Sequence, residues 1–222
     1  MEVHELTVVD DTTREECWAV YERAFGPLRA RAVQRHLMHR HEFDEVLSDP
    51  RVDKYVAVDG SRVVAMATLT NDLSAVPLIS PEYFQTRWPE HYAAGHVWYV
   101  GFLGIDPDYR RTSVSALLIR ALGARAAVTG GVVGVDICDF NEETLRLARS
   151  IRTLGRVVSA ESVLHRLDAQ TFWAYEVPQP SGQGLAVPVE PAAARTVMVL
   201  PAETLHLDAK SEALTAGPQS QP

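Results

Sequence analysis

The chain has 222 residues, 46% of them hydrophobic and 23% charged, a composition typical of a soluble protein with enough apolar side chains for a sizeable core. A formal net charge of −8 argues against nonspecific binding to nucleic acid or to an anionic membrane. Its two cysteines, Cys17 and Cys138, show no CxxC or Cys/His metal spacing, which suits a reducing compartment and excludes a disulfide scaffold. The first residues lack a secretory signal pattern and no apolar run reaches membrane-spanning length, so the cytoplasm is the expected location.

The first fifty residues predict a short strand and then helices. Residues 4–9 alternate polar and apolar side chains, as a half-buried strand does. Two overlapping capping boxes in residues 12–16 would begin a helix, and Gly26-Pro27 would end it. Helical spacing of apolar residues predicts a second helix over residues 28–37, with a further turn or two over residues 43–47.

The next segment predicts a hairpin and a long connection. Residues 54–70 read as two strands joined at Asp59-Gly60, a pair that tolerates the positive φ of a tight turn. Residues 71–96 then contain three prolines and several aromatic side chains. Because loops of this length in a compact domain are usually functional or disordered, and aromatic residues argue against disorder, we expect a binding loop that contains some helix.

Strands and helices alternate after this loop. Residues 97–105 are rich in β-branched and aromatic side chains and predict a strand, and residues 113–127 predict a helix. Residues 131–138 form a continuous apolar run, typical of a strand buried on both faces. A helix over residues 141–155, capped by its first residue, and one or two terminal strands over residues 156–177 complete the predicted domain.

The composition changes at Pro178 to proline, alanine, glycine and glutamine. We therefore expect one domain over residues 1–177 and a tail over residues 178–222. The tail is expected to be mostly disordered unless residues 196–200 pair with a sheet edge.

The helix predicted at residues 113–127 begins beside a basic turn, formed by Arg110 and Arg111. Thr112, Ser113 and Ser115 are good capping residues, and the unpaired N–H groups of a helix start, with its positive dipole end, make an anion site. The turn matches neither GxxxxGK[ST] nor GxGxxG, which argues against a nucleoside triphosphate or a dinucleotide.

A strand, the sequence DPDYRR, a helix-opening turn, an apolar strand and then DFN together resemble the GNAT superfamily of acyl-CoA-dependent N-acyltransferases. The family's phosphate turn reads [RQ]-x-x-G-x-[GA], and both glycine positions hold serine here. The resemblance spans about residues 4–176 and implies an α/β fold, a GNAT-like mixed central sheet with splayed parallel strands, flanked by helices. The residues that match the turn are Arg110, Arg111, Thr112, Ser113, Val114 and Ser115.

The resemblance implies that acetyl-CoA is the acyl donor. Its pyrophosphate would lie on the turn, and its pantetheine arm between residues 98–105 and 132–138. Gly101 and Gly104 would permit the bulge or close ligand approach that separating strands need. Asn141 matches an asparagine that contacts the cofactor in many relatives. Two outcomes stay open for the serines: they bind phosphate, or the turn only caps a core helix. The residues whose main chain would pair with the arm are Phe102, Leu103, Gly104 and Ile105.

Acyl transfer also needs a group that receives the proton of the amine and, in some enzymes, an acid for the leaving thiolate. In many relatives the acid is a tyrosine seven residues after the asparagine, where this chain has Ala148. Tyr109 is expected to be a packing residue. His96 and Tyr99, at the start of the central strand, are the candidate catalytic bases. Less favoured polar residues of the long loop are Asp72, Glu82, Glu90 and His91.

The cluster of His36, His39 and His41 has no acidic residue at a spacing that would support metal ligands and is expected to cap an exposed helix end, so no metal is expected.

The resemblance implies an N-acyltransferase that transfers an acyl group, expected to be acetyl, from CoA to the amine of a small molecule. The alternative is a non-catalytic GNAT-like module that binds CoA or a partner without turnover. Nucleic acid and membranes are not expected as partners, and a homodimer stays open.

Overall fold

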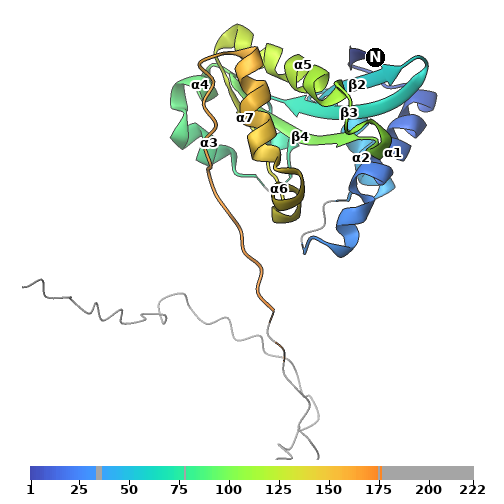
Figure 1. Cartoon of the computed structure of the whole chain (residues 1–222). Helices are drawn as coiled ribbons and strands as arrows, with labels where there is room; N and C mark the ends of the chain where they lie inside the picture. The colour runs from blue at the N-terminus through green and yellow to red at the C-terminus, as the bar shows by residue number, and fades with distance from the viewer. Residues whose placement is uncertain (34–36, 78, 175, 177–222) are drawn as a thin grey trace, which may run out of the picture. The chain divides into compact units, whose positions relative to one another are not determined.

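Five strands form one mixed sheet in the order β1-β2-β3-β4-β5 (Figure 1). The structure is a computed structural model that describes residues 1–33, 37–77, 79–174 and 176. The sheet belongs to the unit formed by residues Met1–Phe172. The predicted tail from Pro178 onward, including residues 196–200, lies outside the described residues. The strands are β1 (Glu2–Leu6), β2 (Asp53–Asp59), β3 (Arg62–Thr70), β4 (Val97–Ile105) and β5 (Val132–Gly134).

Helices flank the sheet on both faces. In the described part of the chain, no helix is long and apolar enough to cross a membrane. The α-helices are α1 (Asp11–Phe25), α2 (Arg40–Ser48), α3 (Pro81–Arg87), α4 (Pro89–Ala93), α5 (Val114–Thr129), α6 (Asp139–Leu145) and α7 (Leu147–Val158). The short 3-10 helices among the described residues are η1 (Gly26–Ala30), η2 (Leu73–Ala75) and η3 (Pro107–Tyr109).

Helix α1 is capped by Asp10, two residues before Thr12, the first predicted capping residue. The Asp10 carboxylate accepts hydrogen bonds from the Thr13 N–H (3.0 Å) and the Thr13 hydroxyl (2.7 Å), so the predicted capping boxes are wrong. Their glutamates make tertiary contacts instead: Glu16 accepts from the Val63 N–H at 2.8 Å, and Glu15 pairs with Arg40. These partners are distant in sequence and could not be predicted from local spacing.

The helix predicted over residues 28–37 is wrong for the described residues. Only η1 forms there, and its Leu28 is buried whereas Val33 is 79% exposed. The apolar positions therefore do not share one buried face, which is what a helix of that spacing requires. The next α-helix, α2, begins at Arg40 after the N-cap residue His39.

The hairpin of β2 and β3 is confirmed, with Gly60 at φ +62° in the turn. The long connection before β4 contains η2, α3 and α4, in agreement with a loop that includes some helix. Its aromatic residues Phe84, Trp88 and Tyr92 pack near the start of β4 in a small apolar cluster. This small apolar cluster thus attaches the long connection to the sheet.

Strand β4 carries a bulge at its centre. Ala67 of β3 pairs with Leu103, and Leu69 pairs with Val100, so Gly101 and Phe102 together lie opposite one residue, Thr68. A Cβ on Gly101 would lie 2.8 Å from the Thr68 hydroxyl, which explains why glycine is needed there. The bulge expected from the glycines is confirmed at Gly101.

The bulge changes which side chains of β4 face each helix layer. Trp98 and Val100, before it, pack in the same core cluster as α5, and Leu103 and Ile105, after it, pack against that cluster. Phe102 faces the opposite layer, where its ring meets the ring of Tyr21 at 5.0 Å. One strand therefore supplies both cores although its alternation shifts by one residue.

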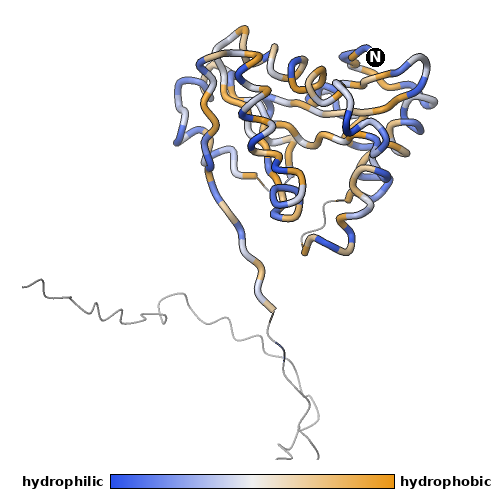
Figure 2. The backbone as a smooth tube through the Cα atoms, viewed as in Figure 1, coloured by the Kyte–Doolittle hydropathy of each residue, from blue (hydrophilic) through white to orange (hydrophobic). Residues whose placement is uncertain are grey.

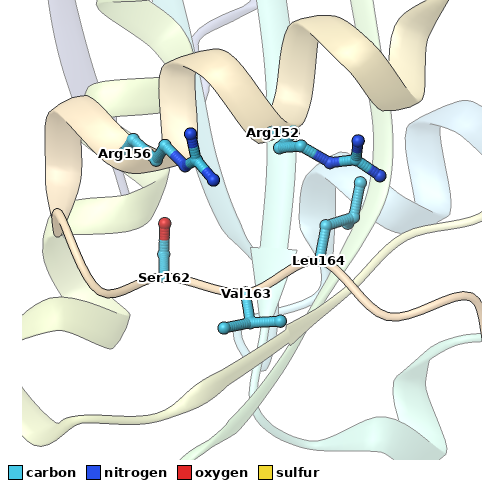
Figure 3. A pocket seen from close by; sticks show the side chains of 5 residues that line it. All are labelled: Arg152, Arg156, Ser162, Val163 and Leu164. Carbon is cyan, nitrogen blue, oxygen red and sulfur yellow. The ribbon is translucent and has the colours of Figure 1, made fainter.

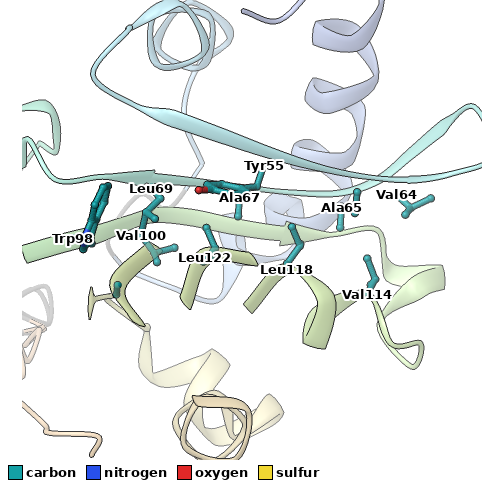
Figure 4. Close-up of a cluster of buried hydrophobic side chains, with 12 residues drawn as sticks. Tyr55, Val64, Ala65, Ala67, Leu69, Trp98, Val100, Val114, Leu118 and Leu122 are labelled. Atoms are coloured by element: carbon teal, nitrogen blue, oxygen red, sulfur yellow. The ribbon is translucent and has the colours of Figure 1, made fainter. Parts of the chain in front are cut away.

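Two apolar cores lie on the two faces of the sheet. Figure 4 shows the core on the α5 side, and Figure 2 shows hydrophobic residues along the strands of the sheet. Helix α5 covers one face with its buried side, and α1 with α2 covers the other. Helix α7 packs on the outer side of α5, where a Cβ on Gly123 would lie 2.8 Å from a methyl group of Val158. The buried residues of α5 are Val114, Leu118, Leu122 and Ala126.

Strand β5 is shorter than predicted. It runs parallel to β4 and pairs through only three residues, the last pair being Tyr99 with Gly134. Val133 and Val135 are 40% and 39% exposed, so the apolar run over residues 131–138 is not a strand buried on both faces. Since β4 continues to Ile105, the two parallel strands stop pairing after Tyr99, which agrees with the predicted fold class.

The region after β5 also differs from prediction. Its helix begins at Asp139 after the N-cap residue Cys138, not at Asn141, and it breaks at Arg146, which has φ 50°. The terminal strands predicted over residues 156–177 are wrong: α7 extends to Val158, and the described residues after it contain no strand. Residues 156–158 thus continue α7, although their sequence predicts extended chain.

The two cysteines differ in burial, which predicts different reactivity. Cys17 is fully buried, and burial raises the pKa of its thiol to about 12, whereas Cys138 is partly exposed. Because the thiolate is the reactive form, we expect iodoacetamide at pH 8 to alkylate Cys138 in the native protein and Cys17 only after unfolding. Mass spectrometry of the labelled peptides tests this, and rapid native labelling of Cys17 would contradict it.

Candidate active site

The end of β4 leads directly into the basic turn and then into α5. Arg110, Arg111, Thr112 and Ser113 are all exposed. Arg110 donates through Nη2 to the Ala24 carbonyl at 3.2 Å, so this guanidinium joins the turn to the C-terminal end of α1. The remaining N–H groups of Arg110 and the side chain of Arg111 face an accessible surface.

Thr112 caps the start of α5. Its hydroxyl donates to the Tyr109 carbonyl (2.7 Å) and accepts from the Val114 N–H (3.3 Å). Ser113, the N-cap residue, makes no capping hydrogen bond with its side chain, and its φ of −74° and ψ of −1° are right-handed. The position therefore does not need glycine for its backbone, and its hydroxyl is not used to cap the helix.

Asp106 anchors the turn, and it was missed in the sequence. Its side chain is 1% exposed and accepts from Arg23 Nη1 at 2.6 Å and from Arg62 Nη2 at 2.8 Å. Its other oxygen accepts from the Asp108 N–H at 3.0 Å. This carboxylate thus ties the residues before the turn to α1 and β3. An aspartate before proline at a strand end was the available signal.

The predicted arm-binding residues lie along the second half of β4. Leu103, Gly104 and Ile105 pair with β3 on one edge, whereas the ladder to β5 has already ended at Tyr99. The Phe102 N–H donates to the Thr68 hydroxyl at 3.3 Å. Gly104 lies against α1, where a Cβ would be 3.2 Å from the Phe25 ring. Beyond Tyr99, the edge of β4 that faces β5 therefore no longer pairs with that strand.

Tyr99 lies where the two parallel strands separate. It is 5% exposed, its ring meets Phe84 edge to face at 6.0 Å, and its hydroxyl donates to Asp136 Oδ1 at 3.0 Å. Burial, with the nearby Asp136 carboxylate, raises the pKa of the Tyr99 phenol. The phenol therefore stays protonated near neutral pH and acts as a hydrogen-bond donor. Asp136, two residues after β5, was not singled out in the sequence.

His96 lies at the other end of β4 from the basic turn. Its N–H donates to the His91 carbonyl (2.8 Å), and its carbonyl accepts from the Val132 N–H (2.9 Å). Its backbone thus joins the long connection to the start of β5. Strand geometry puts Ile105 about 30 Å farther along the chain, so the structure brings His96 close to β5 and not to the turn.

Asn141 lies in the first turn of α6, where its N–H donates to the Cys138 carbonyl at 3.0 Å. Its neighbour Phe140 lies under the Arg31 guanidinium, 4.9 Å from the ring centroid, so α6 is beside the residues that follow η1. Ala148, at the position of the family tyrosine, donates its N–H to Glu142 Oε2 at 2.8 Å. This bond spans the break between α6 and α7.

The other residues considered in the sequence have structural contacts or lie on the surface. The Tyr109 hydroxyl donates to Asp59 Oδ2 at 3.2 Å, and its ring packs against the core that contains α5, in agreement with a packing role. The rings of His39 and His41 stack at 5.9 Å, and His36 lies outside the described residues. Across residues 1–33, 37–77, 79–174 and 176, no group of three or more metal-ligating side chains is found.

A separate hollow of about 280 Å³ lies between α7 and the chain that follows it (Figure 3). Two arginines of α7, one helical turn apart, line one side, and a short extended segment lines the other. None of the sequence-predicted site residues contributes to it. Its lining residues are Arg152, Arg156, Ser162, Val163 and Leu164.

Sequence comparison matches residues 11–151 to the Acetyltransferase (GNAT) family. A comparison with curated proteins gave no match. Solved structures that resemble this one include a mutant of the BH1408 protein from Bacillus halodurans, with 15% identity, a TM-score of 0.48, and coverage of 80% of this chain and 100% of that one.

Two further similar structures have acetyltransferase names. A ribosomal-protein alanine N-acetyltransferase from Escherichia coli has 14% identity and a TM-score of 0.45, over 68% of this chain and 76% of that one. An aminoglycoside N-acetyltransferase solved in complex with CoA has 12% identity and a TM-score of 0.44, over 79% and 100%. Since the family match extends over more than half of the sequence, from α1 through the turn and into α7, the chain belongs to the GNAT acetyltransferase family.

Proposed function

We propose that this protein is an N-acyltransferase that transfers an acetyl group from acetyl-CoA to the amine of a small molecule. One observation carries the proposal: a parallel strand pair stops pairing at Tyr99 and Gly134, and the longer strand leads into an exposed basic helix start. The free main-chain edge can pair with an amide-containing arm, and the helix start can bind phosphate. Membership of the GNAT family supports the same assignment.

The turn has the chemistry of a pyrophosphate site. Unpaired N–H groups at the start of α5, two arginines and the hydroxyl of Ser113 are all suited to phosphate oxygens. Because Thr112 already caps the helix and the Ser113 side chain makes no capping hydrogen bond, the Ser113 hydroxyl is proposed to bind phosphate. The proposed cofactor contacts are Phe102, Leu103, Gly104, Ile105, Arg110, Arg111, Thr112, Ser113, Val114, Ser115 and Asn141.

The proposed reaction is attack of a neutral amine nitrogen on the thioester carbonyl carbon. A C–N bond forms, the C–S bond breaks, and the nitrogen loses a proton that passes to a base or to solvent. His96 is the proposed base, through water. Tyr99 is proposed as a hydrogen-bond donor in the site, because its phenol stays protonated. The departing CoA thiolate is protonated by solvent, since Ala148 cannot supply a proton.

The second candidate is a module that binds CoA without turnover. It is favoured by one specific feature, the replacement of both turn glycines by serine together with alanine at the position of the family tyrosine. Thiol release from acetyl-CoA, measured with a broad panel of small amines, separates the two candidates. Tight CoA binding without thiol release across the panel would support the module.

We expect acetyl-CoA to bind in a calorimetric titration, and Arg110→Ala to weaken this binding by about 10-fold or more, as for loss of a hydrogen bond to a charged group. Arg111→Ala should have a smaller effect, because Arg110 occupies the family's motif position. Both effects should shrink at high salt. Arg120→Ala, an exposed arginine of α5 beyond its first turn, is the matched control. No heat of binding for wild-type protein would contradict the proposed function.

A further inference from the structure

Asp136 and Tyr99 meet at the point where β4 and β5 stop pairing. Tyr99 and Gly134 form the last pair of the ladder, and Asp136 follows two residues later. The Tyr99 hydroxyl donates to Asp136 Oδ1 at 3.0 Å. A carboxylate is therefore held where β4 and β5 begin to separate, on the segment that follows β5.

The two partners of this hydrogen bond are fixed to different degrees by the core. The Tyr99 ring is buried against Phe84, and a Cβ on Gly134 would lie only 2.7 Å from its Cδ2 atom. Asp136, by contrast, is exposed. The phenol thus orients Oδ1 of Asp136, and the exposed residue is accessible to a ligand.

Asp136 also differs from the other carboxylates that the fold positions. Asp106, Asp108 and Asp49 each pair with an arginine. Within the part of the chain that the structure describes, no cationic side chain pairs with Asp136. An oriented, accessible carboxylate without a cation in the protein is suited to a cation from a ligand.

The position of Asp136 relative to the proposed acyl donor gives it a role, so the inference rests on the proposed function. An arm that starts at the basic turn and follows β4 backward from Ile105 has its thioester end toward Gly101 and Tyr99. Gly101 is exposed, so the main chain is open at that point. Asp136 lies beside the end of this path, where the acceptor must meet the thioester.

We propose that Asp136 binds an ammonium group of the acceptor and that Tyr99 is the positioning residue that orients its carboxylate. The amine that attacks the thioester must be neutral, since an ammonium has no lone pair. The ammonium held by Asp136 is therefore a second nitrogen of the same molecule. The acceptor class is a small molecule with at least two amino groups, one that reacts and one that is bound as a cation.

The experiment uses matched pairs of acceptors, such as 1,4-diaminobutane and n-butylamine, and amino sugars with and without their second amine. Thiol release gives the KM of each acceptor, and ligand-observed NMR with CoA present gives binding without turnover. We expect wild-type protein to favour the diamine member of at least one pair. Asp136→Asn should raise the KM of that diamine by about 10-fold or more, with little change in the KM of acetyl-CoA.

The matched variants separate binding from folding. Tyr99→Phe keeps the ring and loses the hydroxyl, so it should raise the diamine KM less than Asp136→Asn does. Asp139→Asn removes one exposed negative charge three residues away and should leave every KM unchanged. Asp136→Glu should restore part of the diamine preference, a rescue that a purely structural role would not produce.

Two results would overturn the proposal. One is an unchanged diamine preference in Asp136→Asn; the other is that no diamine or amino sugar of the panel binds to wild-type protein in the NMR measurement. Calorimetry with acetyl-CoA on the same samples shows which idea has failed. If wild-type protein binds acetyl-CoA but Asp136 has no role in acceptor binding, the proposed function stands. If wild-type protein binds neither acetyl-CoA nor any acceptor, the proposed function is wrong as well.

Discussion

Asp106→Ala is expected to lower the free energy of unfolding by about 2–3 kcal/mol, the cost of removing a buried carboxylate that is hydrogen-bonded to two cations. The loss should not reach the upper range for buried ion pairs, because Arg23 and Arg62 are 43% and 54% exposed and can return to water. The same change frees the residues before the basic turn, so acetyl-CoA binding should weaken as well. Urea unfolding followed by circular dichroism measures the first effect.

The control for this prediction is Asp108→Ala. Asp108 contacts the same Arg23 guanidinium, through Nη2 at 2.8 Å, but its side chain is 70% exposed. Surface ion pairs contribute little to stability, so this variant should unfold close to the wild-type midpoint. If both variants lost the same stability, burial of Asp106 would not be what anchors the turn.

Gly131→Ala is the second change with a large expected effect. An added Cβ would overlap the His96 carbonyl oxygen, which accepts the first hydrogen bond of the β4–β5 junction from the Val132 N–H. A clash with backbone cannot be relieved by rotating a side chain, so the junction must shift. We expect a loss of about 2–3 kcal/mol in the free energy of unfolding, as for overpacking, measured by urea denaturation.

Gly26→Ala is the matched control, because a Cβ there would have nothing within 4 Å and its φ of −48° suits alanine. It should leave stability unchanged or raise it by no more than about 1 kcal/mol. The prediction for Gly131 would be wrong if Gly131→Ala unfolded at the same urea concentration as this control.

Local sequence was sufficient where local chemistry decides the structure. Asp59-Gly60 encodes a turn with positive φ, and the β-branched and aromatic run over residues 97–105 forms β4 with the predicted bounds. Helix α5 follows from its apolar stripe. The turn between them was recognised because helix capping and basic charge are visible within six residues.

Contacts between distant segments account for most of the misses. Arg23 lies 83 residues from Asp106, and Tyr99 lies 37 residues from Asp136, so neither pair has a local signal. The same reason explains why the glutamates after Thr12 were assigned to capping boxes. They bind partners in β3 and α2 that only the folded chain brings near them.

The length of the buried strands was also overestimated from apolar runs. Residues 131–138 predict a long buried strand, but only three residues pair with β4, and both Val133 within the ladder and Val135 beyond it are partly exposed. Residues 156–158 are β-branched or basic, yet they extend α7, because Val158 packs against the bare backbone of Gly123. Tertiary packing overrode strand propensity there.

The bulge at Gly101 has a consequence for how β4 tolerates change in chain length. Deleting Gly101 would leave Phe102 alone opposite Thr68, with Val100 still opposite Leu69 and Leu103 still opposite Ala67. The side chains before and after the deletion would therefore keep the helix layers that they face now. A deletion elsewhere in β4 has no extra residue to absorb it and would turn every side chain on one side of it to the opposite face. The strand thus holds one residue whose loss preserves its reading frame, whereas a deletion at a neighbouring position acts as a frameshift in three dimensions.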